Sequence, residues 1–189
     1  MDSEPLNGSK IDEVVELFID NNVLLYHGIS PSRKIDGQEI PYEKKVRFCM
    51  NGNNKDGFSC STITSTDIFR KNYFEPVGLI VRPIEILLCN KADLGYSKEA
   101  DFITSLILFG NPTIEKCEDA ILNRNEMNEF LVSKFEVQSV GLSSQFTFKD
   151  AEQECKRIAK ELGVNRVIKF GKGFINENSK SITAADIYS

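Results

Sequence analysis

The stretch VLLYHG at residues 23–28 sets four apolar residues before a histidine and a glycine. A short apolar run bounded by polar residues is typical of a buried strand, so we expect this strand to deliver His27 and Gly28 at its far end. Directly upstream, residues 10–21 carry apolar side chains at helical spacing after Ser9, a residue type that caps helices. The chain is therefore expected to begin with a helix that leads into this strand.

The rest of the chain mixes strand and helix signals. Residues 29–56 are polar and rich in Pro, Gly and Asn, which is typical of a binding loop. Two pairs of residues, Arg82-Pro83 and Ser133-Lys134, are expected to separate strands. Gly163 is expected to end a helix, and the polar segment from Asn176 onward is expected to be frayed. Strands are expected at residues 46–50, 57–62, 77–81, 84–89, 130–132, 135–140 and 166–170, and helices from 64 or 65 to 73, from 112, and over 149–162.

The order of these elements predicts the fold class. It lacks the regular strand–helix–strand alternation of a Rossmann or barrel fold. Neither an internal repeat nor a low-complexity linker marks a second domain, and 189 residues are the length of one domain. We therefore expect a single α+β domain over residues 1–189, with a core at about residues 23–142 flanked by an N-terminal helix and a C-terminal helix and strand.

Charge and hydropathy exclude two classes of partner. The chain has 23 basic and 28 acidic residues and a net charge of -5, so it offers no basic field for nucleic acid. No apolar run is long enough to span a membrane, and the acidic start lacks the features of a secretory signal peptide. We expect a soluble protein that is cytoplasmic, or one that a non-classical secretion system delivers into a host cytosol.

The cysteines predict free thiols. Their number is odd, no CxxC pair occurs, and a single histidine is present, so neither a disulfide framework nor a metal site is expected. A reducing, intracellular setting follows from this interpretation. The five cysteines are Cys49, Cys60, Cys89, Cys117 and Cys155.

Three short segments carry the candidate chemistry, since GxGxxG, GxxxxGK[ST] and GxSxG motifs are all missing. They are LYHG at residues 25–28, FSCST at 58–62, and NEFLV at 128–132 followed by FEV at 135–137. Together they resemble the ADP-ribosyltransferase superfamily. Its members place a His or Arg at the end of a first core strand, a hydroxyl-rich or Tyr-bearing strand in the middle, and a catalytic Glu at the start of a late strand.

The resemblance implies a split, mostly antiparallel core and a glycosyltransferase that uses NAD as its substrate without a metal. Glu129 would be the catalytic carboxylate, acting on the positive charge that develops on the ribose as nicotinamide leaves. The ADP-ribose would be transferred to a side chain of a protein acceptor, as in toxins and effectors. The residues implied in NAD binding are His27, Gly28, Ser59, Ser61 and Thr62.

Two departures from the family pattern bear on the acceptor. His27 matches the branch that has Tyr in the middle strand, whereas Ser59 to Thr62 match the branch that begins with Arg. Members that modify arginine carry a second Glu or Gln two positions before the catalytic Glu, where this chain has Met127, with Glu126 one residue further back. The resemblance therefore does not name the acceptor side chain.

Two other functions remain open on the sequence. Cys60 and His27 could form the nucleophile and base of a cysteine hydrolase or deamidase, which requires an exposed thiol with a lowered pKa. Alternatively, the chain could be a non-catalytic module that binds a protein through residues 29–56. NAD binding and the reactivity of Cys60 discriminate among these alternatives.

Overall fold

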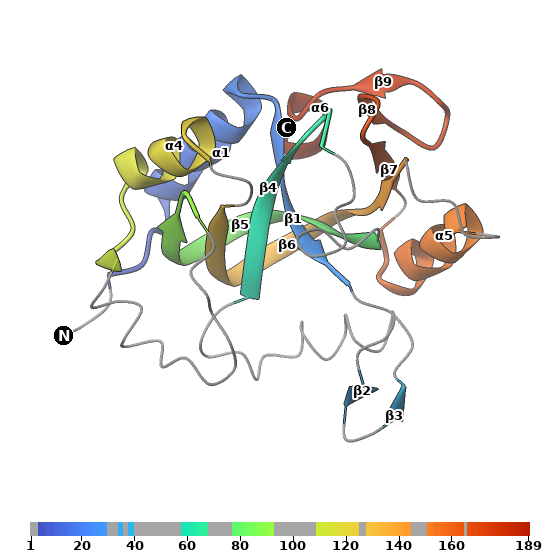
Figure 1. Cartoon of the computed structure of the whole chain (residues 1–189), viewed down its shortest axis with the longest axis horizontal. Helices are drawn as coiled ribbons and strands as arrows, with labels where there is room; N and C mark the ends of the chain where they lie inside the picture. The colour runs from blue at the N-terminus through green and yellow to red at the C-terminus, as the bar shows by residue number, and fades with distance from the viewer. Residues whose placement is uncertain are drawn as a thin grey trace.

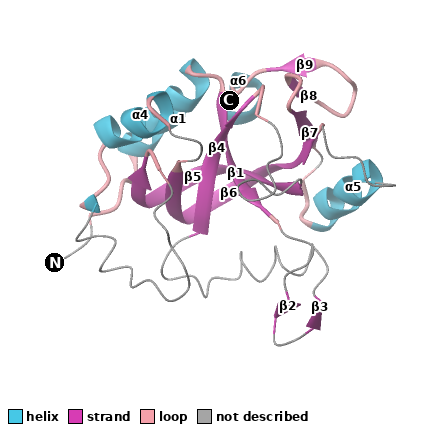
Figure 2. Cartoon of the chain, viewed as in Figure 1, coloured by secondary structure: helices cyan, strands magenta, loops and turns pink. Residues whose placement is uncertain are grey.

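A seven-stranded sheet with helices on its flanks makes up most of the described chain (Figures 1 and 2). The computed structural model describes residues 4–29, 34–35, 38–39, 58–67, 77–92, 109–124, 128–144, 151–164 and 166–189. The sheet contains β1 (Val23–Gly28), β4 (Phe58–Thr64), β5 (Val77–Asn90), β6 (Glu129–Ser143), β7 (Val167–Phe170), β8 (Phe174–Ile175) and β9 (Ser181–Ile182). The helices are α1 (Ser9–Asp20), α4 (Ile114–Leu122), α5 (Ala151–Glu161) and α6 (Ala185–Tyr188), and β2 (Lys34–Ile35) and β3 (Gln38–Glu39) form a separate ribbon.

The long strand β6 connects the two parts of the sheet. The strand order is β4-β1-β5-β6-β7-β8-β9, and β4 pairs in addition with β6. β4, β1, β5 and β6 therefore close into a ring, from which β7 to β9 extend on the far side of β6. All pairings in the sheet are antiparallel except that of β6 with β7. The expected α+β class with a mostly antiparallel core is confirmed.

β5 and β6 are each one continuous strand, so the expected breaks at Arg82-Pro83 and Ser133-Lys134 are wrong. The two strands pair along nearly their whole length, from Val77↔Leu142 to Asn90↔Glu129. The pairing accommodates the proline through register shifts on both sides of Glu85, which bend the two paired strands without ending them. This bend lets the first part of β6 reach β4 while its last part reaches β7.

The helix ends follow local chemistry with one exception. Thr113 caps α4, since its hydroxyl accepts a hydrogen bond from the backbone N–H of Lys116 at 3.2 Å. Gly163 follows α5 at φ +75°, a conformation that favours glycine, as expected for its stop. Ser9, however, is the first residue of α1 and not its cap, because Gly8 occupies that position at φ 56° without a side-chain hydrogen bond.

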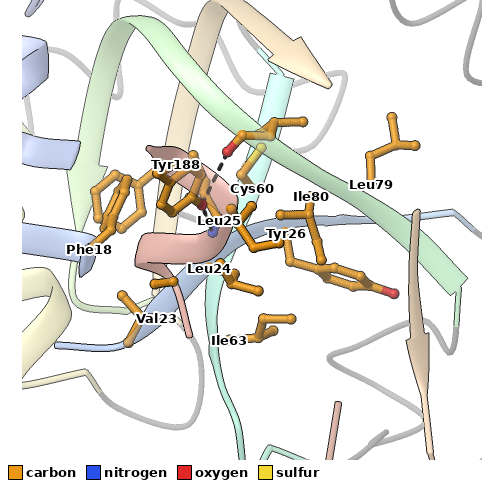
Figure 3. Close-up of a cluster of buried hydrophobic side chains, with 14 of the residues drawn as sticks. Phe18, Val23, Leu24, Leu25, Tyr26, Cys60, Ile63, Leu79, Ile80 and Tyr188 are labelled. Atoms are coloured by element: carbon orange, nitrogen blue, oxygen red, sulfur yellow. Dashed lines mark hydrogen bonds between the residues drawn. The ribbon is translucent and has the colours of Figure 1, made fainter. Parts of the chain in front are cut away.

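The C-terminal end is ordered, so the expectation of fraying from Asn176 is wrong. Ile187 and Tyr188 are buried, and the Tyr188 ring packs beside Phe18 of α1. The Tyr188 hydroxyl accepts a hydrogen bond from the backbone N–H of Leu25 at 2.7 Å and donates to the carbonyl of Val81 at 3.3 Å (Figure 3). Because the β1–β5 ladder starts only at Tyr26↔Ile80, this hydroxyl supplies the missing bridge between the two strands.

Some expectations concern parts of the chain outside the described residues. The expected strand at 46–50 lies there, as do residues 68–73 of the expected second helix and most of the 29–56 segment. The part of that helix that is described differs from the expectation, since Thr64 is the last residue of β4 and a turn follows it. Within the described residues, no helix is both long and apolar enough to cross a membrane.

Candidate active site

The register between β4 and β6 brings the second and third sequence segments together. Ser59 pairs with Leu131 and Cys60 pairs with Phe130. Side chains alternate between the two faces of a strand, so Glu129 lies on the same face as Ser59, and Cys60 lies on the opposite face with Phe130. The pairing of these strands therefore separates the hydroxyl and carboxylate from the thiol.

Ser59 and Glu129 form a direct hydrogen bond on that face. The Ser59 hydroxyl donates to Glu129 Oε1 at 2.6 Å, and Glu129 is only 3% exposed, whereas Ser59 is exposed. A hydroxyl bound to one carboxylate oxygen fixes the orientation of that carboxylate. Charge on a buried carboxylate also acts more strongly on a nearby cation than the same charge in water.

His27 joins this pair from β1. Its Nδ1 lies 2.6 Å from the carbonyl oxygen of Ser59, and because a carbonyl can only accept, Nδ1 is the nitrogen that donates. The imidazole ring also stacks on Phe58, with ring centroids 3.8 Å apart, and Phe58 stacks in turn on Phe135 of β6 at 4.7 Å. One hydrogen bond and one aromatic contact thus set the ring orientation of His27.

Gly28 ends β1 directly after this histidine. It pairs with Gly78 of β5, and the backbone N–H of Ile29 donates to the carbonyl of Val77 at 2.8 Å. A Cβ at Gly78 would overlap the carbonyl of His27 and the ring of Tyr26. A glycine at position 78 is therefore needed for β5 to pass beside the His27–Gly28 end of β1. This requirement was not predicted from the sequence.

Ser61 and Thr62 make buried hydrogen bonds to Asn128, the residue before Glu129. The Ser61 hydroxyl donates to the carbonyl of Asn128 at 2.5 Å. The Asn128 side chain accepts from the backbone N–H of Thr62 at 2.8 Å and donates to the Thr62 hydroxyl at 2.7 Å and to the Ala120 carbonyl at 2.8 Å. Asn128 therefore holds the start of β6 against β4 and α4, and with it the position of Glu129.

Arg124 reinforces the same junction from the end of α4. Its Nη1 donates to the carbonyl of Thr62 at 2.5 Å, and its two terminal nitrogens each lie 2.9 Å from a carboxylate oxygen of Asp67. Asp67 also accepts a hydrogen bond from the backbone N–H of Thr64 at 2.7 Å. This bidentate ion pair is one-fifth exposed or less on both sides, which fixes the end of β4.

Cys60 points away from the Ser59–Glu129 pair, toward the face of β4 that carries Phe58 and the ring of His27. It is 1% exposed and lies beside Leu25 and Tyr188 in the apolar cluster (Figure 3). Burial raises the pKa of its thiol well above the ordinary range, and the nearby charge of Glu129 raises it further. A thiol in this environment stays protonated and is a poor nucleophile.

The structure brings together two of the residues expected from sequence, places a third on the neighbouring backbone, and gives two others a different setting. Ser59 and Glu129 share a side-chain hydrogen bond, whereas His27 donates to the backbone carbonyl of Ser59 and stacks on Phe58, which lies on the other face of β4. Ser61 and Thr62 lie beside them, but their hydroxyls are engaged with Asn128. Sequence reasoning missed the roles of Asn128 and Arg124, although an Asn directly before a strand-initiating Glu is a signal that could have drawn attention to the first.

The described residues contain no group of three or more His, Cys, Asp or Glu side chains placed to hold a metal ion. Comparison with models of protein families gives no match, and comparison with curated proteins gives none either.

Proposed function

We propose that this chain is an NAD-dependent mono-ADP-ribosyltransferase that modifies a side chain of a protein acceptor. The observation that carries the proposal is the hydrogen bond between the Ser59 hydroxyl and Glu129 Oε1 at 2.6 Å. It joins, in three dimensions, the middle and last segments on which the family resemblance rests. The hydrogen bond from His27 Nδ1 to the backbone carbonyl of Ser59 connects the first segment to the middle one.

Each residue has a role in the proposed reaction. The glycosidic bond between the ribose and nicotinamide breaks, and its electron pair leaves with nicotinamide. The acceptor side chain forms a new bond to the ribose carbon and loses a proton to water. Glu129 stabilises the positive charge that develops on the ribose, and Ser59 keeps its carboxylate oriented. His27 binds the adenosine side of NAD. Gly28, which has no side chain, lets the backbone approach the nicotinamide end.

Ser61 and Thr62 contribute to the proposed site through Asn128. Their hydroxyl groups hold the carbonyl and the amide of Asn128, which precedes Glu129 in the chain. In this assignment they set the position of the catalytic carboxylate, and Ser59 is the hydroxyl of this strand that faces NAD.

The burial of Cys60 argues against a cysteine hydrolase or deamidase. Such an enzyme needs an accessible thiolate next to a base, whereas the thiol of Cys60 is 1% exposed, with its pKa raised by burial. A non-catalytic protein-binding module is the remaining alternative. The proposed setting is the cytoplasm, or the cytosol of a host cell that receives the chain as an effector.

Calorimetric titration of the chain with NAD, followed by an assay of nicotinamide release, tests the proposal. We expect saturable NAD binding and slow release of nicotinamide, with ADP-ribose transferred to protein when an extract of candidate acceptors is added. A chain that binds no NAD at millimolar concentration and releases no nicotinamide would overturn the proposal and favour the binding module.

A further inference from the structure

Cys89 and Cys117 form a buried pair of thiols where α4 packs on the sheet. α4 lies beside α1 and contacts β5, the strand that carries Cys89 (Figure 1). The Cys117 thiol donates a hydrogen bond to the Cys89 sulfur at an Sγ–Sγ distance of 3.4 Å. Cys117 is fully buried, and Cys89 is 5% exposed. The fold therefore places in contact two sulfurs that lie 28 residues apart in sequence.

We infer that Cys89 and Cys117 are an oxidative modification site that a peroxide converts from two thiols into a disulfide. Cys89 is the more accessible sulfur and reacts first, giving a sulfenic acid and one water molecule as the peroxide O–O bond breaks. The hydrogen bond to Cys89 and burial raise the pKa of the Cys117 thiol, so its reaction depends on the contact between the two sulfurs. The Cys117 sulfur attacks the Cys89 sulfur, its proton passes to the leaving hydroxyl as the S–O bond breaks, and a second water molecule leaves. Two thiols and one hydrogen peroxide thus give one disulfide and two waters.

The geometry favours this pair over the other described cysteines. A disulfide needs an S–S length of about 2.05 Å, so the two sulfurs have to approach by only about 1.4 Å, a shift that side-chain rotation can supply. Cys60 and Cys89 pair with Phe130 from opposite sides. Cys60 and Cys89 therefore lie on strands that do not pair with each other. Cys155 lies on α5, which contacts β6 and β7 and lies at the opposite end of the view from α4 in Figure 1.

The disulfide would attach α4 to the sheet next to Glu129. Cys89 pairs with Phe130, and the next residue of β5, Asn90, pairs with Glu129. α4 already meets the start of β6 through the bond from Asn128 to the Ala120 carbonyl. Oxidation would add a covalent attachment one turn earlier on α4 and would restrict the unfolded chain by closing a loop between the two cysteines.

The test is oxidation of the folded full-length chain with a small excess of hydrogen peroxide, followed by denaturation, alkylation of the remaining thiols and mass spectrometry of the intact protein and its peptides. We expect one intramolecular crosslink between the peptides of Cys89 and Cys117, with the other three thiols alkylated. The crosslink should disappear in Cys89→Ala and in Cys117→Ala. It should persist in the matched control Cys155→Ala, which also removes a buried thiol.

The melting temperature supplies a second measurement. Oxidised wild type should melt about 5–10 °C above reduced wild type, and Cys89→Ala should show no such difference between oxidised and reduced samples. Five alkylated thiols after peroxide treatment, sulfinic acids in place of a crosslink, or a crosslink to Cys49, Cys60 or Cys155 would overturn the inference. A crosslink that forms only after the chain is unfolded would overturn it as well.

Discussion

The Asn128 side chain is hydrogen-bonded to Thr62 twice, with Oδ1 accepting from the backbone N–H at 2.8 Å and Nδ2 donating to the hydroxyl at 2.7 Å. Backbone pairing between β4 and β6 reaches Cys60↔Phe130, and the amide of Asn128 continues it beyond that point with side-chain atoms. The same Nδ2 donates to the Ala120 carbonyl of α4. One fully buried side chain therefore joins two strands and a helix directly beside Glu129.

Replacing this amide should be costly. Asn128→Ala leaves the Thr62 N–H and the Ala120 carbonyl buried without their present partner, so we expect a loss of about 2–4 kcal/mol in the free energy of unfolding. Asn123→Ala is the matched control, because Asn123 donates to Asp119 on the exposed side of α4 and should cost about 0.5 kcal/mol or less. Urea unfolding followed by circular dichroism measures both values. Equal losses in the two variants would contradict this account of Asn128.

Tyr188 tests whether the C-terminal end is part of the core. Tyr188→Phe keeps the ring and removes the hydroxyl, so the buried N–H of Leu25 and the carbonyl of Val81 lose their bridge. We expect a loss of about 1–3 kcal/mol in unfolding free energy, again measured in urea. Ser189→Ala, which changes only an exposed side chain, should leave stability nearly unchanged. A chain that tolerates Tyr188→Phe as well as it tolerates Ser189→Ala would show the bridge to be unimportant.

Glu85 gives a prediction about pH. The hydroxyl of Ser133 donates to Glu85 Oε1 at 2.6 Å and Lys134 Nζ lies 3.0 Å from Oε2, and these partners, Ser133 first, lower the pKa of the carboxyl. A lowered folded-state pKa adds stability that is present above the unfolded-state pKa of about 4.3 and is lost as pH falls through the folded-state value. Glu85→Gln should therefore cost about 1 kcal/mol at pH 7, and this cost should shrink as the pH falls through the lowered folded-state pKa. A cost that stays constant from pH 7 to pH 3 would contradict an electrostatic origin.

The sequence predicted elements well where the signal was local. α1, β1, α4, α5 and β7 all appear close to their expected residues, since each depends on periodicity, a cap or a glycine stop within a few positions. The breaks at Arg82-Pro83 and Ser133-Lys134 failed because strand pairing overrode them, and pairing partners far apart in sequence cannot be read from a window. The prediction of a frayed C-terminal end failed for the same reason, since Tyr188 is held by hydrogen bonds to Leu25 and Val81, which are far from it in sequence.

For the candidate site, residue types were easier to predict than their partners. His27, Ser59 and Glu129 were proposed from short segments and stay a prediction, and the structure adds a hydrogen bond from the Ser59 hydroxyl to Glu129 and one from His27 to the Ser59 carbonyl. Asn128 and Gly78 were missed because their importance depends on what faces them. Asn128 faces a backbone N–H of β4, and Gly78 faces the carbonyl of His27.

Replacing His27 is expected to lower the affinity for NAD. In the proposed function it contacts the adenosine side of NAD, so His27→Ala should weaken NAD binding about tenfold, the cost of one lost hydrogen bond with its contacts. Calorimetry gives the affinity, and circular dichroism checks that the stack on Phe58 is not needed for folding. A variant that folds and binds NAD as wild type does would remove His27 from the proposed site.

Glu129 separates the three functions, because each assigns it a different role. In a transferase the carboxylate acts mainly on the charge that develops as nicotinamide leaves, so its removal should reduce turnover far more than NAD affinity. Glu129→Gln retains the shape and an oxygen that can accept from Ser59, and removes the charge. We expect nicotinamide release to fall by about 10²–10³-fold while folding and NAD binding persist. Glu136→Gln is the matched control, since Glu136 is an exposed carboxylate on the same strand and should leave turnover unchanged.

Cys60→Ala completes the set of variants, because it separates the transferase from the cysteine hydrolase. The thiol lies on the opposite face of β4 from Ser59, so a transferase should retain nicotinamide release when the thiol is removed. A cysteine hydrolase would lose all activity on its substrate in Cys60→Ala and keep it in Glu129→Gln. A binding module would show no turnover in any variant, wild type included. Equal nicotinamide release by wild type and Glu129→Gln would exclude Glu129 as the catalytic carboxylate, because the charge that carries the proposed mechanism would then be dispensable.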